Sequence, residues 1–203
     1  MVIRPARKED EAVATELIAL SMGAFGDALF GLGDPARHRR AIACMLRGTD
    51  TRFSRRLVEI AEWEGQAAGL LLSFPGSQIL RLDAAVGRYF LRLYGLGGTL
   101  RILARALRFA GSTEARGGEY YVSNLAVLPA FWGKGIARGL LQHAEEKARA
   151  AGLAKCSLLV EVDNSRARAL YERTGYRVVH SYLTPHLAKS MGTAGHLRMV
   201  KVL

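Results

Sequence analysis

The stretch that decides the fold is YYVSNLAVLPAFWGKGIARGLLQHAEEKARAAG, residues 120–152. An apolar, aromatic-rich run stops at a proline, and a short loop with two glycines follows. An amphipathic run then extends to a final glycine, which is typical of a helix over residues 136–151. A glycine loop between a strand and a helix leaves the first helical amides free to hold a phosphate. The stretch therefore predicts a phosphate-binding turn.

The glycine pair alone does not say which phosphate ligand is bound. Gly133 and Gly135 allow a tight turn and a close approach of the backbone to a ligand. A Walker A loop is excluded, because it needs Ser or Thr directly after its Gly-Lys pair. Gly139 does not fall at the third glycine of the dinucleotide-binding pattern G-x-G-x-x-G, which excludes that class as well.

Length and composition favour a single globular domain. The chain has 203 residues, half of them hydrophobic, which is enough to bury a core. We expect one domain over residues 1–203 with a helical insertion at about residues 77–118. We expect neither a signal peptide nor a membrane span, because no apolar run reaches the required length, and hence a cytoplasmic protein. Cys44 and Cys156 lie far apart without a C-x-x-C motif, so we expect no disulfide framework and no metal.

The net charge of +11 is concentrated in two blocks. Residues 34–56 hold seven arginines against two aspartates, and residues 81–116 hold seven arginines against one aspartate and one glutamate. A basic surface favours nucleic acid, acidic lipid or a phosphorylated cofactor. A general bias toward arginine in the composition explains the same charge. Nucleic acid is not the expected partner, since no stacked-aromatic or helix-turn-helix pattern is present.

The order of the remaining elements predicts a mixed α+β (α/β) sheet. The expected strands are residues 2–6, 57–63, 66–74, 119–128, 155–162, 176–182 and 196–202, and the expected helices are residues 8–20, 34–47, 136–151 and 165–173. Two further helices with arginine-rich polar faces are expected within residues 77–118, separated by a glycine-rich break. Basic amphipathic helices can lie on membranes, but they more commonly pack one face on a core, which we favour here.

A second cluster lies on the helix that follows the buried strand at residues 155–162. Asn164 and Tyr171 are seven residues apart, nearly two helical turns, so both face the same way. Beside a phosphate loop they indicate a cofactor groove. The alternative interpretation is an asparagine that caps the helix and a tyrosine that packs in the core.

Taken together, these motifs resemble those of the GNAT superfamily of N-acetyltransferases. Residues 132–137, WGKGIA, resemble the acetyl-CoA motif R/Q-x-x-G-x-G/A, and residues 124–129, NLAVLP, resemble the fourth strand of that family. Residues 164–176, NSRARALYERTGY, resemble its N-x-x-A-x-x-L-Y-x-x-x-G-F/Y signature. Trp132 departs from the motif, which usually has Arg or Gln there, so the resemblance leaves no side-chain contact assigned at this position.

The resemblance implies a central sheet of about seven strands with splayed fourth and fifth strands and helices on both faces. It implies acetyl-CoA as co-substrate, held between the splayed strands. The implied cofactor contacts are Leu125, Ala126, Val127, Trp132, Gly133, Lys134, Gly135, Ile136, Ala137, Arg138, Asn164, Ala167 and Tyr171. The Leu125 amide would polarise the thioester carbonyl, and Tyr171 would protonate the departing thiolate, which suits a neutral phenol.

The acceptor side is less well defined by the motifs. Glu119 and Tyr121 are the nearest candidates for the base, with Glu119 acting through water, while Tyr121, Ser123 and Asn124 would position the substrate. We expect the insertion to cover the acceptor end of the cleft, with Arg81 binding an acidic acceptor, or to pack against a second subunit in a homodimer. The implied reaction is direct acetyl transfer, without an acyl-enzyme, to a primary amine of a small molecule or peptide. The alternative is a non-catalytic acyl-CoA sensor of the same fold.

Overall fold

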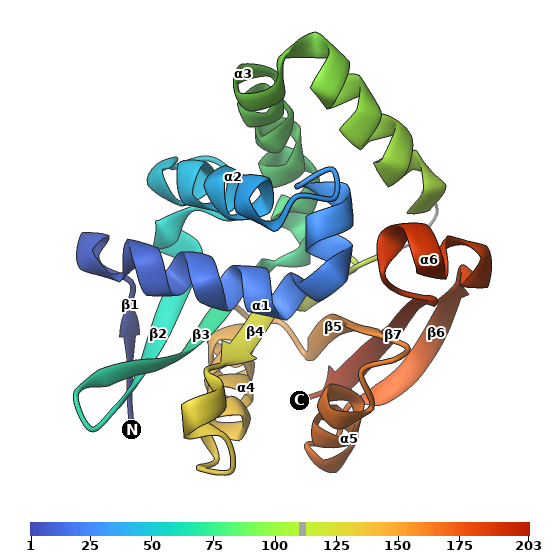
Figure 1. Cartoon of the computed structure of the whole chain (residues 1–203). Coiled ribbons are helices and arrows are strands. Elements are labelled where there is room, and N and C mark those ends of the chain that lie inside the picture. The colour runs from blue at the N-terminus through green and yellow to red at the C-terminus, as the bar shows by residue number, and fades with distance from the viewer. Residues whose placement is uncertain (110–112) are drawn as a thin grey trace.

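A single mixed sheet organises the computed structural model, which describes residues 1–109 and 113–203. Within those residues, seven strands lie in the order β1-β2-β3-β4-β5-β7-β6 (Figure 1). They are β1 (Val2–Pro5), β2 (Val58–Trp63), β3 (Gln66–Pro75), β4 (Tyr120–Val127), β5 (Lys155–Glu161), β6 (Arg177–Leu183) and β7 (Gly195–Val202). Only β4 and β5 pair in parallel among these strands. The expected mixed sheet is confirmed.

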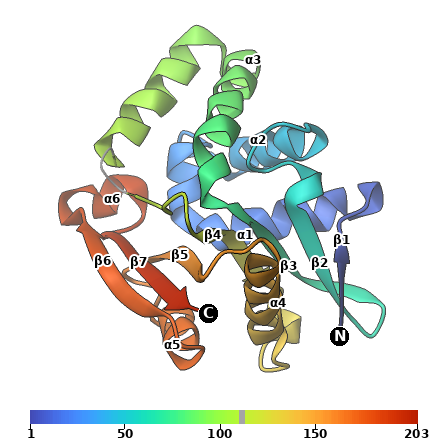
Figure 2. The same ribbon diagram turned by 180° about the vertical axis from the view of Figure 1, so that it is seen from behind.

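Helices cover both faces of this sheet, as the two opposite views show (Figures 1 and 2). They are α1 (Glu11–Leu29), α2 (Pro35–Arg47), α3 (Ile79–Ala106), α4 (Ile136–Ala150), α5 (Ser165–Arg173) and α6 (Ala188–Met191). Alternation along β3 divides the core: Leu70 and Leu72 pack with α1 and α2, whereas Leu71 packs with α4. The site described below therefore lies between two well-filled apolar layers.

Helix α1 is a layer of the core rather than a free helix. Residues Lys8–Leu29 are long and apolar enough to cross a membrane by length and composition alone. In the structure, Leu17 and Ile18 are fully buried, and the helix bends at Gly23, where φ is 50°. The sequence predicts that Gly23 and Gly26 both break the helix that begins near residue 8. Gly23 does so, but the break at Gly26 is wrong: Gly26 stays helical, and its missing side chain lets the His38 ring of α2 lie against the helix.

Helix α3 forms the insertion between β3 and β4. It bends at Gly95 (φ 63°), so two helical arms are present, as expected. The amide of Gly76 donates to the carbonyl of Glu119 at 2.8 Å, which holds the two ends of the insertion together. One side of the second arm exposes leucines at helical spacing: Leu96, Leu100, Leu103 and Leu107.

The sheet opens between β4 and β5. These strands pair only from Tyr120–Val122 against residues 156–158, and then they separate. Leu72 pairs with Asn124 but Ser73 pairs with Val122, so Ser123 is the extra residue of a β-bulge at this point. The splayed fourth and fifth strands expected from the sequence are thus present.

Beyond the bulge, β4 has a free backbone edge. The amide of Leu128 donates to the carbonyl of Ala68 at 2.9 Å, on the β3 side. Hydrogen-bonding direction alternates along an antiparallel strand, so the backbone groups of Leu125 and Val127 point away from β3 into the gap. The gap therefore presents strand donors and acceptors to a ligand.

Candidate active site

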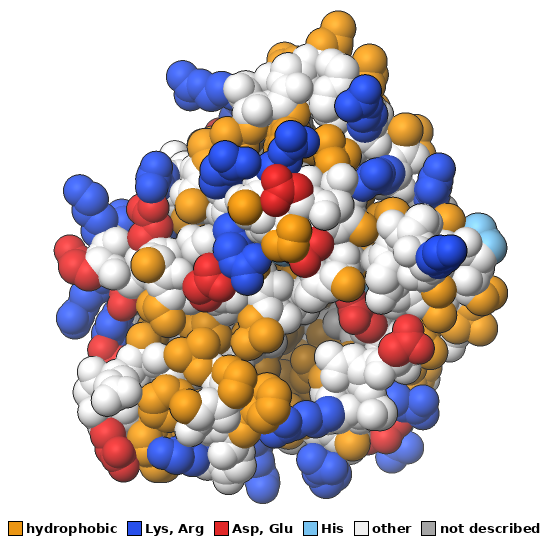
Figure 3. Space-filling model, in the orientation of Figure 1, with side chains coloured by type: hydrophobic (Ala, Val, Ile, Leu, Met, Phe, Trp, Pro, Cys, Tyr) orange, Lys and Arg blue, Asp and Glu red, His pale blue; other side chains and the backbone are white. Residues whose placement is uncertain are grey.

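The gap between β4 and β5 opens into a cavity of about 1200 Å³, which extends from the glycine loop to α3. Ligand pockets for one small molecule measure about 300–1,000 Å³, so this volume suits two reactants. Figure 3 looks onto a hollow in this region, with hydrophobic side chains around it and Lys and Arg side chains along its lower edge.

The glycine loop forms one end of the cavity. Gly133 (φ 80°) and Gly135 (φ 78°) adopt left-handed backbone, which costs about 1–2 kcal/mol for other residues. Gly135 is the N-cap of α4, and the amide of Gly139 makes the first bond back to its carbonyl, at 3.0 Å. The amides that precede Gly139 in the helix have no partner within it. Together with the helix dipole they form a cradle for an anion.

Arginines also line the cavity. Arg138 projects from the first turn of α4, and Arg166 and Arg173 belong to α5 on the opposite side of the gap. Arg138 and Arg166, whose guanidinium lies against the Trp132 ring, are cations beside the amide cradle and fit the phosphates of a coenzyme A thioester.

Trp132 supplies a side-chain contact at the position where the motif usually has Arg or Gln. Its indole Nε1 donates to the carbonyl of Val127 at 2.8 Å, and the Arg166 guanidinium lies 3.7 Å from its ring centre. The indole therefore links the end of β4 to α5 across the groove. The Val127 carbonyl already accepts this one hydrogen bond, and the Val127 amide points into the gap, where it can make a strand-like contact with a ligand.

Lys134 behaves differently from the other loop residues. Its ammonium lies 5.4 Å from the ring centre of Trp63 and 5.2 Å from that of Phe131, and its side chain does not line the cavity. The expected cofactor contact of Lys134 is therefore limited to its backbone. The other expected cofactor residues do line the cavity: Leu125, Ala126, Val127, Ile136, Ala137 and Ala167, with Trp132 and the two glycines.

Asn164 and Tyr171 both reach the cavity from α5. The Asn164 side-chain oxygen accepts from the amide of Ala167 at 3.0 Å, so the capping interpretation holds for this atom. Tyr171 is 8% exposed, and burial raises the pKa of its phenol to about 12. Tyr171 is thus a neutral proton donor throughout the physiological pH range.

The opposite end of the cavity holds an ion-pair cluster that the motifs did not reveal. Arg52 Nη1 lies 3.1 Å from Asp83 Oδ1 and 3.2 Å from Glu114 Oε1, and Nη2 also pairs with Glu114. Arg52 Nη2 donates to Ser123 Oγ at 3.3 Å. Burial opposes ionisation of Glu114, but Arg52 outweighs it and lowers the pKa of that carboxyl. Glu114 is consequently a weak base.

The residues expected to position the substrate are close to this cluster. Tyr121, Ser123 and Asn124 all line the cavity. Asn124 Nδ2 donates to Ser21 Oγ of α1 at 2.8 Å, which ties β4 to α1 at this point. Burial and the adjacent Glu114 raise the pKa of Tyr121 well above its usual value, so its phenol stays protonated.

Glu119 does not lie where a base is needed. It is 5% exposed, does not line the cavity, pairs with buried Arg198 and accepts from the amide of Arg116 at 2.9 Å. Burial raises the pKa of this carboxyl, but the hydrogen bond from Arg198 and the other donors lower it overall. The structure therefore makes Glu119 a structural partner of Arg198, which corrects its expected role.

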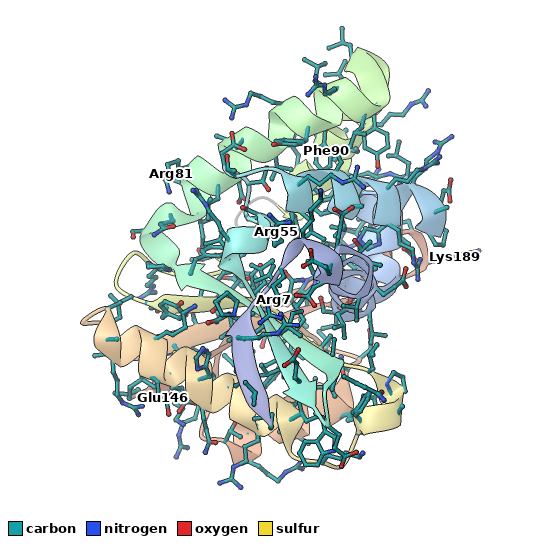
Figure 4. The ribbon with its side chains drawn as sticks, turned by 90° about the vertical axis from the view of Figure 1, so that its left-hand side faces the viewer. Arg7, Arg55, Arg81, Phe90, Glu146 and Lys189 are labelled. Atoms are coloured by element: carbon teal, nitrogen blue, oxygen red, sulfur yellow. The ribbon has the colours of Figure 1, made fainter. Side chains whose placement is uncertain are left out.

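Arg81 is also misplaced for its expected role. It is exposed and does not line the cavity. Phe90, nine residues later, is on the opposite side of α3 and faces the core, whereas Arg81 points outward (Figure 4). Arg88, a second arginine of the insertion, pairs with Asp50 on the surface.

Glu161 is a further cavity carboxylate that the motifs missed. Val160 packs in the α4 core, so its neighbour Glu161 faces the α1 side of the sheet, opposite His196 on β7. Phe25 of α1 lies there, with its ring centre 5.0 Å from that of His196. Burial, and then the charge of Asp163, raise the pKa of Glu161 to about 7. A carboxylate at the end of an apolar parallel strand was the signal that could have found it.

These features define an acyltransferase that uses a coenzyme A thioester: an opened parallel strand pair, an amide cradle beside arginines, and a buried phenol. The model of the Acetyltransferase (GNAT) family matches residues 34–176, and the chain belongs to this family. It is an acetyltransferase. In the described parts of the chain, no cluster of three metal-binding side chains occurs.

Solved structures share the fold of this chain. An N-acetyltransferase from Staphylococcus aureus Mu50 superposes over the full length of both chains with a TM-score of 0.70 and 21% identity. The PaiA N-acetyltransferase from Thermoplasma acidophilum in complex with coenzyme A covers 100% of this chain and 98% of that chain, with a TM-score of 0.55 and 14% identity. At such identities the likeness shows the fold alone.

One curated relative is a mycothiol acetyltransferase of Beutenbergia cavernae, 44% identical over 66 residues. The match covers 32% of this chain and 22% of that protein, so this chain spans about a fifth of the relative's length.

Proposed function

We propose that this protein transfers the acetyl group of acetyl-CoA directly to a primary amine of a small molecule or peptide. The observation that carries the proposal is that one cavity holds both proton-handling groups that the reaction needs. Glu161, with a pKa of about 7, can accept a proton, and Tyr171, with a pKa of about 12, can donate one. Acetyl-CoA supplies an acetyl group activated as a thioester.

The cofactor half of the cavity fits acetyl-CoA. The amides at the start of α4, with Arg138 and Arg166, would hold its phosphates. The free edge of β4 would pair with the pantetheine arm through the backbone of Leu125 and the amide of Val127. Asn164, through its side-chain nitrogen, and Ala167 would contact the same arm from α5.

The acceptor amine must lose its proton before it attacks the acetyl carbon. Glu161 would accept this proton, directly or through one water. The new C–N bond forms as the C–S bond breaks, and the Tyr171 phenol gives its proton to the departing sulfur. The nitrogen then loses its second proton to give the neutral amide, and this proton restores the Tyr171 phenol through solvent. The Leu125 amide would donate to the carbonyl oxygen, where negative charge develops, and the loss of one such donor costs about 2.7–4 kcal/mol in other enzymes.

The state of the cysteines supports direct transfer. Cys156 is buried, and burial raises the pKa of its thiol to about 12, so it is not available as a thiolate nucleophile. Cys44 does not line the cavity.

The test is thiol release from acetyl-CoA with a panel of primary amines, compared among the wild type, Tyr171→Phe and Glu161→Gln. We expect amine-dependent release that both variants reduce by about 10²-fold or more. If acetyl-CoA stabilised the protein against heat but no amine produced thiol, the sensor alternative would replace this proposal.

The homodimer and the cytoplasmic location expected from the sequence remain predictions. The exposed leucines of the second α3 arm are the surface that a second subunit would cover. Light scattering after size exclusion, repeated with Leu100→Glu, would test this surface.

A further inference from the structure

We infer that the acceptor is a hydrophobic primary amine, whose apolar body occupies a chamber between α1 and α3. This inference rests on the proposed function, because it names the acceptor class of the same site. We call the chamber the apolar chamber and define it by the side chains Phe30, Phe53, Val86, Phe90, Ile102 and Leu103, which line the cavity beyond β4.

Aromatic packing gives the apolar chamber fixed walls. The ring centre of Phe30 lies 5.2 Å from that of Phe90 and 5.7 Å from that of Phe53. Val86, Phe90 and Ile102 are almost fully buried although they border the cavity. The insertion α3 supplies four of the six defining side chains, so the chamber depends on this insertion. Walls of this kind bind an alkyl or aryl group, at about 0.8 kcal/mol per buried methylene.

The charges along the cavity are separated by sign. The glycine-loop end carries Arg138 and Arg166, which suit phosphates. On the α1 and α3 side, the cavity is lined by three carboxyl groups, Asp83, Glu114 and Glu161. They outnumber the one guanidinium there, that of Arg52, which pairs with Asp83 and Glu114. An excess of carboxylates beside an apolar chamber attracts a ligand with an ammonium group and a hydrophobic body.

A second ligand could fill the same apolar volume, namely the tail of an acyl-CoA longer than acetyl. Such a tail carries no charge, so Asp83 and Glu114 would offer it nothing. The carboxylates therefore favour the hydrophobic amine over the acyl chain. The experiment below tests both ligands, the amine and the long-chain acyl-CoA.

Two glycines of α3 give a matched pair of variants. Gly87 lines the cavity, and Gly97, on the same insertion, does not. Neither has left-handed backbone, and a Cβ added at either meets no heavy atom within 4 Å. Leucine is tolerated in helices better than glycine, so both substitutions should fold. Gly87→Leu adds volume at the chamber wall, and Gly97→Leu is the control.

The experiment measures kcat/KM for ethylamine, hexylamine and 2-phenylethylamine with acetyl-CoA, and for ethylamine with hexanoyl-CoA. Calorimetry of hexylamine with the protein holding coenzyme A gives binding without turnover. We expect wild type to prefer hexylamine over ethylamine by about tenfold or more. Gly87→Leu should remove most of this preference and weaken hexylamine binding by a similar factor, while ethylamine turnover stays within about twofold. Gly97→Leu should match wild type.

Two results would overturn the inference. One is a Gly87→Leu protein that keeps the wild-type amine preference. The other is a wild type that prefers hexanoyl-CoA to acetyl-CoA, with that preference lost in Gly87→Leu, which would assign the chamber to the acyl chain. If no amine gave turnover but hexylamine bound and Gly87→Leu weakened that binding, the proposed function would fail while the amine site stood.

Discussion

Replacement of Glu161 by glutamine tests the acid–base assignment most directly. Glutamine keeps the shape of the side chain but cannot accept the proton. Because the Glu161 pKa is about 7, about nine-tenths of the carboxyl is ionised at pH 8 and about one-tenth at pH 6. We therefore expect wild-type kcat/KM to fall about tenfold between these pH values through this group. At pH 8, Glu161→Gln should lower kcat/KM by about 10²–10⁴-fold. It should also remove the acid limb of the pH–rate profile, which is the fall in kcat/KM as the pH drops below about 7.

The same substitution has a predicted effect on stability with a defined sign. The Glu161 pKa is raised in the folded protein from its ordinary value of 4.5, so the folded state binds this proton more tightly than the unfolded state. Its contribution to stability is complete below pH 4.5 and is lost as the pH rises through about 7. Between pH 5 and pH 8, the wild type should thus lose free energy of unfolding relative to Glu161→Gln.

The assays are the rate of thiol release measured from about pH 5.5 to about pH 9, and urea unfolding of the wild type and Glu161→Gln at pH 5 and at pH 8. Asp163→Asn is the control, because the charge of Asp163 contributes to the raised pKa of Glu161. It should move the acid limb to lower pH without removing it. A Glu161→Gln enzyme that retained the wild-type rate and acid limb would refute the reasoning.

Three further substitutions test other parts of the site. Tyr171→Phe should lower kcat by about 10²-fold or more, while the affinity for acetyl-CoA measured by calorimetry changes little. An equal loss of kcat and of acetyl-CoA affinity would indicate that Tyr171 only packs in the core. Gly135→Ala should lower the free energy of unfolding by about 1–2 kcal/mol in urea and weaken acetyl-CoA binding, because φ at this position is 78°; an unchanged protein would contradict the cradle. Glu119→Gln should cost about 3–5 kcal/mol of stability by leaving buried Arg198 unpaired, yet keep the acid limb near pH 7. A missing limb in that variant would restore Glu119 as the base.

The elements of the fold were predictable where local chemistry determines them. Asp34 caps α2 by accepting from the amide of Ala36 at 2.8 Å, and Pro35 begins the helix, as the residue order indicates. The glycine loop and α4 follow the same local logic. Gly26 was wrongly expected to end a helix, because its reason for being glycine is the contact with α2, which the sequence does not display.

The cofactor side of the site was predictable and the acceptor side was not. The glycine loop, Asn164 and Tyr171 lie within two continuous motifs, so their spacing carries the information. The acceptor side combines Arg52, Asp83, Glu114 and Glu161 from four separate parts of the chain, and only tertiary packing brings them to one cavity. Glu119 and Tyr121 were the base candidates because of their position on the strand, while burial and ion pairing decide which carboxyl reaches the cavity.

The bond between the Gly76 amide and the Glu119 carbonyl has a consequence for how specificity can change in this family. This hydrogen bond joins the two ends of the insertion next to the paired residues Pro75 and Tyr120 of β3 and β4. For the sheet, the insertion is therefore equivalent to a long hairpin loop whose two ends are held at a constant distance. The entropic cost of such a loop grows only slowly with its length. A differently shaped helical arm could therefore replace α3 between these two residues, and the four chamber side chains that α3 supplies would change together while the thioester half of the enzyme stayed as it is.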